Sequence, residues 1–247
     1  MAKQVQFYEN IAPISAKRHQ RWCIEKQPDY AYASDSNAVP ITTAEFAAAA
    51  LEYSIVFLAN EGAPTPVALL GLNTQENLYL EDGHRWKARY IPAFVRRYPF
   101  VFSKSEDNNT YTLCIDESFQ GCNQEGRGEA LFDMSGAGTN YLNAMMQFVT
   151  SYQQQITKTK AFCEKLKELD LLEAMTATFQ LPSGDKAQVK GFMAVNRDKL
   201  TQLPGHTLAE LASSGALELI YAHLLSMRNF AELLELRTDQ QRSNPSS

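Results

Sequence analysis

The chain has 247 residues, of which 45% are hydrophobic, 21% are charged and 11% are aromatic. This balance is typical of globular proteins, and it excludes disordered, collagen-like and coiled-coil chains. The net charge of -5 argues against a nucleic-acid partner, because a nucleic-acid-binding surface must be basic to neutralise phosphate groups.

The N-terminal half is predicted to be rich in strands. Residues 1–40 mix aromatic, proline and polar residues without a clear period, so we expect an irregular arm that packs over the domain. Thr42 and Thr43, followed by Glu45 and an alanine run, are typical of a helix start. Runs of β-branched and aromatic residues between turn residues then predict a mostly antiparallel sheet. The predicted strands are residues 53–59, 67–72, 78–80, 100–103 and 111–116.

The C-terminal half has helical periodicity. Thr139 is placed to cap a long helix that runs towards Leu169, because apolar residues recur there every three or four positions. Residues 177–195 predict an extra hairpin that turns at Ser183-Gly184-Asp185, and residues 200–211 predict short helices. A second apolar stripe extends over residues 217–234.

These elements predict an α+β fold in which long helices from the C-terminal half pack on the N-terminal sheet. We expect a single domain at residues 41–237, preceded by the arm and followed by a polar, mobile tail at residues 238–247.

The sequence also predicts where the protein resides. The N-terminal residues lack the continuous apolar run of a secretory signal, and no stretch reaches the ~20 uncharged residues of a membrane span. The four cysteines are scattered without a CxxC pair, so free thiols are favoured over a disulfide or a zinc site. We therefore expect a cytoplasmic protein without a transmembrane segment.

Basic and aromatic residues are densest in residues 83–102. Guanidinium groups bind carboxylates and stack on rings, so this segment suits an anionic or planar ligand, and it equally suits a protein hot spot. Alternatively, its aromatic residues form core and its arginines pair with acidic residues elsewhere. The candidate binding residues are Trp86, Arg89, Tyr90, Arg96, Arg97 and Tyr98.

Four further residues are weaker candidates. Asp116 and Glu117 end a predicted strand and could bind a cation or transfer protons, although consecutive strand side chains point to opposite faces. Asp133 opens a glycine-containing loop before a helix, where an anion could bind or the carboxylate could accept local turn bonds. His223 lies on an apolar helix, which favours a core histidine. The sequence contains no metal-ligand spacing, nucleotide-binding motif or nucleophile elbow, so no cofactor or metal is expected.

Several segments resemble, in the same order, the SapC family of bacterial proteins. They are residues 66–72, Trp86 with residues 90–100, and residues 113–117, 131–133, 169–173 and 215–226. The resemblance extends from about residue 53 to residue 236, and the string Ile-Pro-Ala-Phe-Val-Arg-Arg-Tyr-Pro-Phe is its most specific part. Members of this family are often encoded near flavin-dependent tryptophan-halogenase-like enzymes, cupin-like proteins and TonB-dependent receptors. The resemblance therefore implies an accessory role in nutrient uptake or peptide modification, and it transfers no catalytic residue.

Three hypotheses follow. The first is an intracellular accessory protein that binds a partner enzyme or a peptide through the segment from Trp86 to Tyr98. The second is an enzyme in which carboxylates such as Asp116, Glu117 or Asp133 converge with that segment in one pocket. The third is a structural protein associated with a surface layer.

Overall fold

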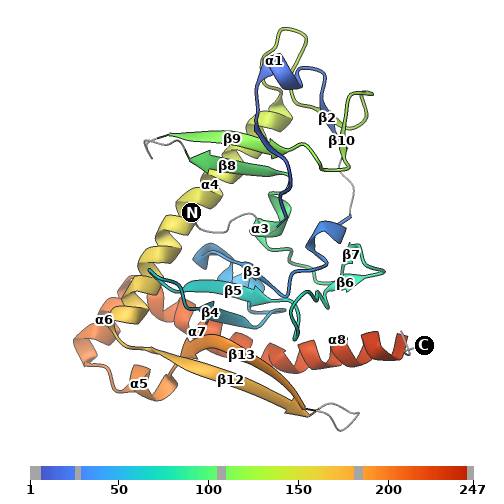
Figure 1. Ribbon diagram of the computed structural model, residues 1–247. Helices are drawn as coiled ribbons and strands as arrows, with labels where there is room; N and C mark the ends of the chain where they lie inside the picture. Colours follow the sequence, from blue (N-terminus) through green and yellow to red (C-terminus); the bar gives the residue numbers. More distant parts are fainter. Residues whose placement is uncertain (1–6, 26–28, 105–109, 181–185, 244–247) are drawn as a thin grey trace.

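The computed structural model describes residues 7–25, 29–104, 110–180 and 186–243. Two lobes are joined by one long helix, α4 (Asn140–Glu168), as Figure 1 shows. We call the part with the five-stranded sheet and the C-terminal helices the lower lobe, and the part with β8 (Phe100–Lys104) and β9 (Tyr111–Asp116) the upper lobe. Antiparallel sheets and a separate helical region confirm the predicted α+β class.

The lower lobe is built on an antiparallel sheet in the order β12-β13-β4-β5-β3. The sheet forms because β-branched and aromatic residues suit a strand that is covered on both faces, and Ile55, Val56 and Phe57 are completely buried. Its strands are β3 (Ala38–Pro40), β4 (Ile55–Leu58), β5 (Thr65–Leu69), β12 (Leu172–Gln180) and β13 (Lys186–Val195).

The predicted C-terminal hairpin is present as β12 and β13, but it is part of the main sheet. β13 pairs with β4, with Phe192 opposite Leu58 and Met193 opposite Phe57. Phe192 belongs to the main hydrophobic core, so burial of this strand depends on residues from the first half of the chain. The turn predicted at residues 183–185 lies outside the described residues.

Helices cover the lower sheet. The predicted start at Thr42 is confirmed: a capping box joins Thr42 to Glu45 at the beginning of η2 (Thr43–Glu45), and α2 (Phe46–Ala49) follows. The predicted stripe at residues 217–234 is divided among three consecutive helices. The C-terminal helices are α5 (Arg197–Thr201), α6 (Gly205–Ser213), α7 (Ala216–Ser226), η3 (Met227–Asn229) and α8 (Phe230–Ser243). Thus α8 extends six residues into the segment expected to be a tail, and residues 244–247 lie outside the described residues.

The upper lobe contains two small antiparallel sheets, in the orders β1-β9-β8 and β10-β2-β11. The strands of the N-terminal half are therefore divided between the lobes and do not form one sheet. A second hydrophobic cluster, which includes Phe100, Ile115 and Leu131, explains this division. The remaining elements are β1 (Ile11–Pro13), α1 (Ala16–His19), β2 (Cys23–Ile24), β10 (Cys122–Asn123) and β11 (Glu129–Ala130).

The first forty residues contribute one strand to each of three sheets, an edge strand in two of them and the central strand in the third. β1 pairs with β9, β2 pairs with β10 and β11, and β3 pairs with β5. Each of these N-terminal strands has only two or three residues, which is too short for a hydrophobic period to show in the sequence. The segment expected to be irregular is therefore held largely by backbone hydrogen bonds.

Short elements lie between the lobes (Figure 1). They are η1 (Ala31–Ala33), the two-residue strands β6 (Leu80–Glu81) and β7 (Arg85–Trp86), and α3 (Ala93–Arg96). Of the strand predicted at residues 78–80, only Leu80 is in a strand, β6, which pairs with β7. We use the name waist for residues 29–36, 96–99 and 118–121, which surround the clefts described below.

Helix α4 connects the two hydrophobic cores. Its N-terminus is capped as predicted, because the Thr139 Oγ1 accepts the N–H of Leu142 at 3.3 Å. Leu142 and Val149 pack in the upper core, and Phe162 and Leu166 pack in the lower core.

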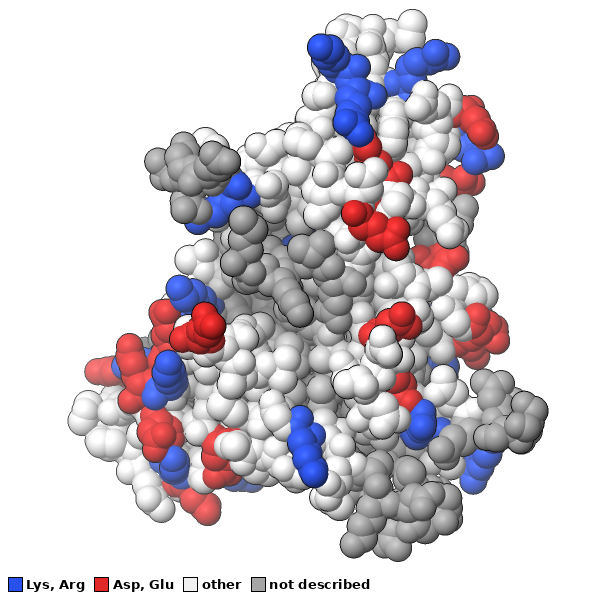
Figure 2. Space-filling model, viewed as in Figure 1, with Lys and Arg blue, Asp and Glu red and all other residues white. Residues whose placement is uncertain are grey.

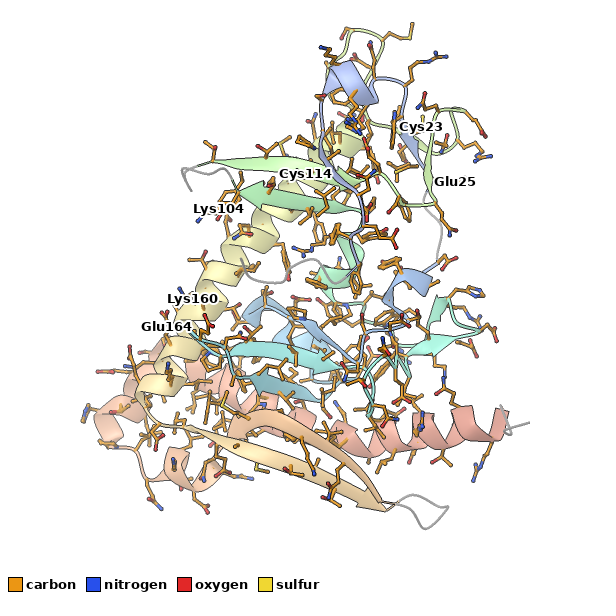
Figure 3. All side chains as sticks on the ribbon, in the orientation of Figure 1. Cys23, Glu25, Lys104, Cys114, Lys160 and Glu164 are labelled. Carbon is orange, nitrogen blue, oxygen red and sulfur yellow. The ribbon has the colours of Figure 1, made fainter. Side chains whose placement is uncertain are left out.

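The described part of the chain contains no helix that combines the length and the apolar character needed to cross a bilayer. On the face in Figure 2, acidic and basic side chains are interspersed. Lys160 and Glu164, labelled in Figure 3, form one such pair at 3.7 Å on the solvent side of α4. All four cysteines are free thiols, and Cys23 and Cys114 lie on strands of the upper lobe (Figure 3).

Candidate functional site

Two clefts at the waist share one aromatic wall. Cleft A, of about 380 Å³, and cleft B, of about 540 Å³, are both lined by Asp29, Tyr32, Tyr98 and Phe119. We call these four residues the shared wall. The wall is built from segments that are far apart in the sequence, because residues 29–32 and the turn after β9 both pack against the chain that follows α3.

The rings of the shared wall are in direct contact. The ring centres of Tyr32 and Tyr98 are 4.3 Å apart, and those of Tyr98 and Phe119 are 5.3 Å apart with an edge-to-face geometry. Tyr30 extends the cluster towards Trp86, at 5.7 Å. Such packing holds the rings in place and gives a ligand rigid apolar surfaces.

The tyrosines supply neutral hydroxyl groups. Burial raises the pKa of Tyr32 well above its ordinary value, and it also raises those of Tyr98 and Tyr141. These phenols therefore keep their protons at physiological pH. Tyr32 donates its hydroxyl proton to the Val95 carbonyl at 3.0 Å, which fixes the wall to α3.

The charges around the two clefts differ. Cleft A contains Glu25, which follows β2 and is labelled in Figure 3, and the basic residue Arg96. Cleft B contains Glu9 and Asp35 in addition to Asp29, and no Lys or Arg is among its described lining residues. Cleft A thus offers groups of both signs, whereas cleft B is acidic.

Two of the six candidate binding residues line the clefts. Tyr98 belongs to both clefts, and its hydroxyl lies 3.4 Å from the Asp116 Oδ2. Arg96 is exposed in cleft A, donates from Nε to the Ile91 carbonyl at 2.8 Å, and stacks over Phe148 at 5.2 Å. The Arg96 guanidinium is therefore held in place at the lining of cleft A.

Trp86, Arg89 and Tyr90 line neither cleft. Trp86 is buried and donates its indole N–H to the Tyr53 hydroxyl at 2.8 Å. Tyr90 donates its hydroxyl proton to the buried Glu45, and the backbone N–H of Arg89 is bound by Glu52 while its side chain is exposed. In this basic and aromatic segment, Trp86 and Tyr90 thus bond to buried residues, whereas the Arg89 side chain lies at the surface.

Arg97 follows α3 and is buried, unlike its neighbour Arg96. Its guanidinium carbon lies 4.4 Å from the ring centre of Phe94, 5.0 Å from that of Tyr152 and 5.9 Å from that of Tyr8. It is thus surrounded by rings, and Tyr8 also lines cleft B.

The candidate carboxylates are each held by their own partners. Burial alone would raise the pKa of Asp116, but hydrogen bonds from the Ser118 hydroxyl and from the N–H groups of Ser118, Glu9 and Asn10 lower it overall. Glu117 binds Arg18 and His19. Since Asp116 turns inward to backbone donors and Glu117 binds α1, the two carboxylates do not act together.

The remaining pKa shifts of the candidate carboxylates have local causes. The Arg18 guanidinium holds the pKa of Glu117 below its usual range. Hydrogen bonds from Ser135 and then from the Ala137 N–H lower the pKa of Asp133, which closes its own turn before α4. None of these carboxylates lines cleft A or cleft B, so the structure does not bring them together in a pocket.

His223 has the environment of a core histidine. Its Nδ1–H donates to the Ile55 carbonyl at 2.8 Å, and its Nε2 accepts the N–H of Val195 at 3.0 Å. Burial lowers the pKa of His223 to about 4. The neutral ring therefore joins α7 to β4 and β13.

Most cleft residues lie outside the segment singled out from the sequence. Tyr30, Tyr32, Phe119 and Tyr141 were not predicted as site residues, although Tyr30 and Tyr32 stand in a polar, proline-containing stretch. Aromatic residues in such a stretch are a sequence signal that could have identified Tyr30 and Tyr32. Phe119 and Tyr141 carry no comparable signal, because their neighbours in space are distant in sequence.

A comparison with protein-family models finds a match over residues 14–233 to the family described as SapC. Comparisons with curated proteins and with solved structures find no match.

Proposed function

The chain belongs to the SapC family, and we propose that it is an accessory protein that binds a partner enzyme or a peptide at the waist. The observation that supports this proposal is the pair of clefts with a shared aromatic wall. Two adjacent clefts can accept neighbouring side chains of one extended segment, whereas a small-molecule site is more often a single enclosed pocket.

The chemistry of the wall favours a protein ligand. Tyrosine rings give large contact areas at a low entropic cost, and their hydroxyl oxygens can accept N–H groups of a partner. Arg96 beside Tyr98 adds the residue type that is enriched, with tyrosine, among residues that dominate binding energy. We assign Arg96 and Tyr98 to this surface together with Tyr30 and Phe119.

The partner that we propose to test first is a flavin-dependent halogenase-like or a cupin-like enzyme, in a nutrient-uptake or peptide-modification system. This choice follows the family resemblance. We also propose a cytoplasmic location, which agrees with the four free thiols, because thiols stay reduced in that compartment.

Site-specific photo-cross-linking tests the proposal. Benzoylphenylalanine replaces Tyr30 in cleft A or Gln120 in cleft B, and as a control it replaces Tyr221, an exposed aromatic residue on α7. In cells of the native host, we expect one and the same protein to be cross-linked from both cleft positions and not from Tyr221. Mass spectrometry identifies the partner and the peptide attached.

A second variant measures the energetic role of the wall. Removing a central aromatic side chain of a binding surface costs about 2 kcal/mol, so Phe119→Ala should weaken partner binding roughly 30-fold. Circular dichroism confirms that the variant is folded. Equal cross-linking from all three positions, or undiminished binding by Phe119→Ala, would contradict the proposal.

A further inference from the structure

Arg97 has a buried guanidinium edge, formed by Nε and Nη2, that donates no hydrogen bond to any described residue. The residue is 2% exposed, and its Nε and Nη2 atoms are fully buried without a hydrogen-bond partner in the described part of the chain. The rings of Phe94, Tyr152 and Tyr8 attract the cation, but cation–π contacts leave these N–H groups without an acceptor. A buried charge without a partner is costly, so the edge is a candidate binding group.

Arg18 shows what the same edge binds elsewhere in this protein. Its Nε donates to one carboxylate oxygen of Glu117 and its Nη2 donates to the other. This two-point geometry is how guanidinium recognises carboxylate, and a lysine cannot reproduce it. The two nitrogens engaged in Arg18 are the two that are unpartnered in Arg97.

The two buried carboxylates among the described residues have partners other than Arg97. Glu45 accepts hydrogen bonds from Thr42, Tyr90 and Ala93. Asp116 binds backbone N–H groups and Ser118, as described above. The six residues that precede Phe7 in the sequence contain no Asp or Glu. The carboxylate that would complete the edge is therefore expected to come from another molecule.

We propose that the Nε–Nη2 edge of Arg97 binds a carboxylate of the partner that docks at the waist. This inference rests on the proposed function, because the partner supplies the carboxylate. Arg97 itself is not among the described lining residues of cleft B, but Tyr8, which contacts it, is; the carboxylate therefore reaches the buried edge from cleft B when the Tyr8 ring moves aside. Because Glu9, Asp29 and Asp35 make that cleft acidic, the ligand carries a basic group close to its carboxylate.

Three dipeptide probes test this chemistry. Acetyl-Lys-Tyr carries a chain-end carboxylate, acetyl-Lys-Glu-amide carries a side-chain carboxylate, and acetyl-Lys-Tyr-amide carries none. The readout is the Nε–H signal of Arg97 in nitrogen–proton NMR, which is assigned by its loss in Arg97→Lys. We expect at least one carboxylate probe to shift this signal in a saturable manner, while the amide probe leaves it in place.

The more effective of the two carboxylate probes shows whether the source is a chain end or a side chain. At 100 times its dissociation constant, that probe should also raise the Tm of the wild type by about 5–10 °C.

Substitutions separate binding from structure. Arg97→Lys retains the charge but lacks the Nε–Nη2 edge. We expect it to weaken binding of the carboxylate probe at least 10-fold. Arg97→Met should abolish the effect of the probe without lowering the Tm of the free protein, since it removes an unpaired buried charge. Arg228→Met, at an exposed arginine on η3, is the matched control and should bind the probe as the wild type does.

The outcomes distinguish the inference from the proposed function. If neither carboxylate probe shifts the Arg97 signal while Tyr30 and Gln120 still cross-link a partner, the inference fails and the proposed function stands. A lower Tm in both Arg97 variants with unchanged probe binding would show a structural role instead. Glu106 and Asp107 lie outside the described residues, so the variant Glu106→Gln/Asp107→Asn is included. Movement of the Arg97 signal in that variant, without a probe, would identify an internal partner and overturn the inference.

Discussion

Glu45 is a buried residue whose carboxylate joins residues 42–45 to residues 90–93. It accepts the N–H groups of Thr42 and Ala93 and the hydroxyl of Tyr90, at 2.7–2.8 Å. Removing it leaves buried donors without an acceptor, so Glu45→Ala should lower the free energy of unfolding by about 2–4 kcal/mol. Tyr90→Phe removes one of these bonds and should cost about 1 kcal/mol. Urea denaturation measures both, and Glu61→Ala, at an exposed position, should change stability by less than about 0.5 kcal/mol.

His223 makes stability depend on pH. Burial lowers its pKa from the ordinary 6.5 to about 4 in the folded protein. Between these values the unfolded chain binds a proton that the folded protein does not bind, so stability falls as the pH falls from 6.5 to 4. The loss assigned to this residue is about 3 kcal/mol. Urea denaturation at several pH values should show a smaller loss over this range for His223→Gln than for the wild type. Equal losses would contradict the assignment.

At the scale of elements, the long helix α4 depends on its first turn. Thr139 accepts the N–H of Leu142 and donates its hydroxyl proton to the Ala130 carbonyl at 2.6 Å, so the cap also ties the helix to β11. Thr139→Ala should therefore cost about 1–2 kcal/mol of unfolding free energy, whereas Thr139→Ser retains the hydroxyl and should cost little. Thermal and urea denaturation of both variants test this. Equal stability of the Ala and Ser variants would show that the cap is unimportant.

The hairpin of β12 and β13 shows what element prediction misses. Its register shifts between Met175 and Thr176, and Gly191 stands opposite the shift with a φ of +79°. Such a bulge bends the strand, and the two residues that follow Gly191 in β13, Phe192 and Met193, pair with β4. The alternating residues predict the two strands, but the sheet that they join depends on contacts with residues more than 130 positions earlier.

At the scale of the whole molecule, α4 links the two hydrophobic cores, and so do β8 and β9, with Val101 and Cys114 in the main cluster and their neighbours Phe100 and Ile115 in the second. Phe148 packs against both clusters, and Tyr152 begins the part of α4 that is buried in the lower lobe. The upper and lower lobes should therefore unfold together in the wild type, because α4, β8 and β9 each have side chains in both cores, and the loss of one core removes support from the other.

Breaking α4 at this point should uncouple the lobes. Ser151 is exposed, and Ser151→Pro removes one backbone hydrogen bond and places a ring against the preceding turn, at a cost of about 3 kcal/mol. We expect two unfolding transitions in this variant, seen as different midpoints by far-ultraviolet circular dichroism and by tyrosine and tryptophan fluorescence. Ser151→Ala should keep a single transition. A single transition in Ser151→Pro would show that the lobes are coupled by other contacts.

The candidate site was predicted only in part. Arg96 and Tyr98 lie in the segment chosen for its basic and aromatic residues, and both line cleft A. Trp86 and Tyr90 have the same local signal but face the core, where they bond to Tyr53 and Glu45. Composition shows that a segment can bind a ligand, but it does not show which of its side chains are turned towards solvent.

The sequence by itself determined the α+β class, the capped helix that begins after Thr139, most of the longer strands, and the family of the chain, because these depend on local periodicity and on continuous strings of residues. Only the tertiary structure decided the rest. It divided the strands between two lobes, brought residues 29–32 and Phe119 to the chain after α3, and buried Arg97 among three rings. The physical reason is that pairing and burial between distant segments depend on the packing of two separate cores, which no local pattern records.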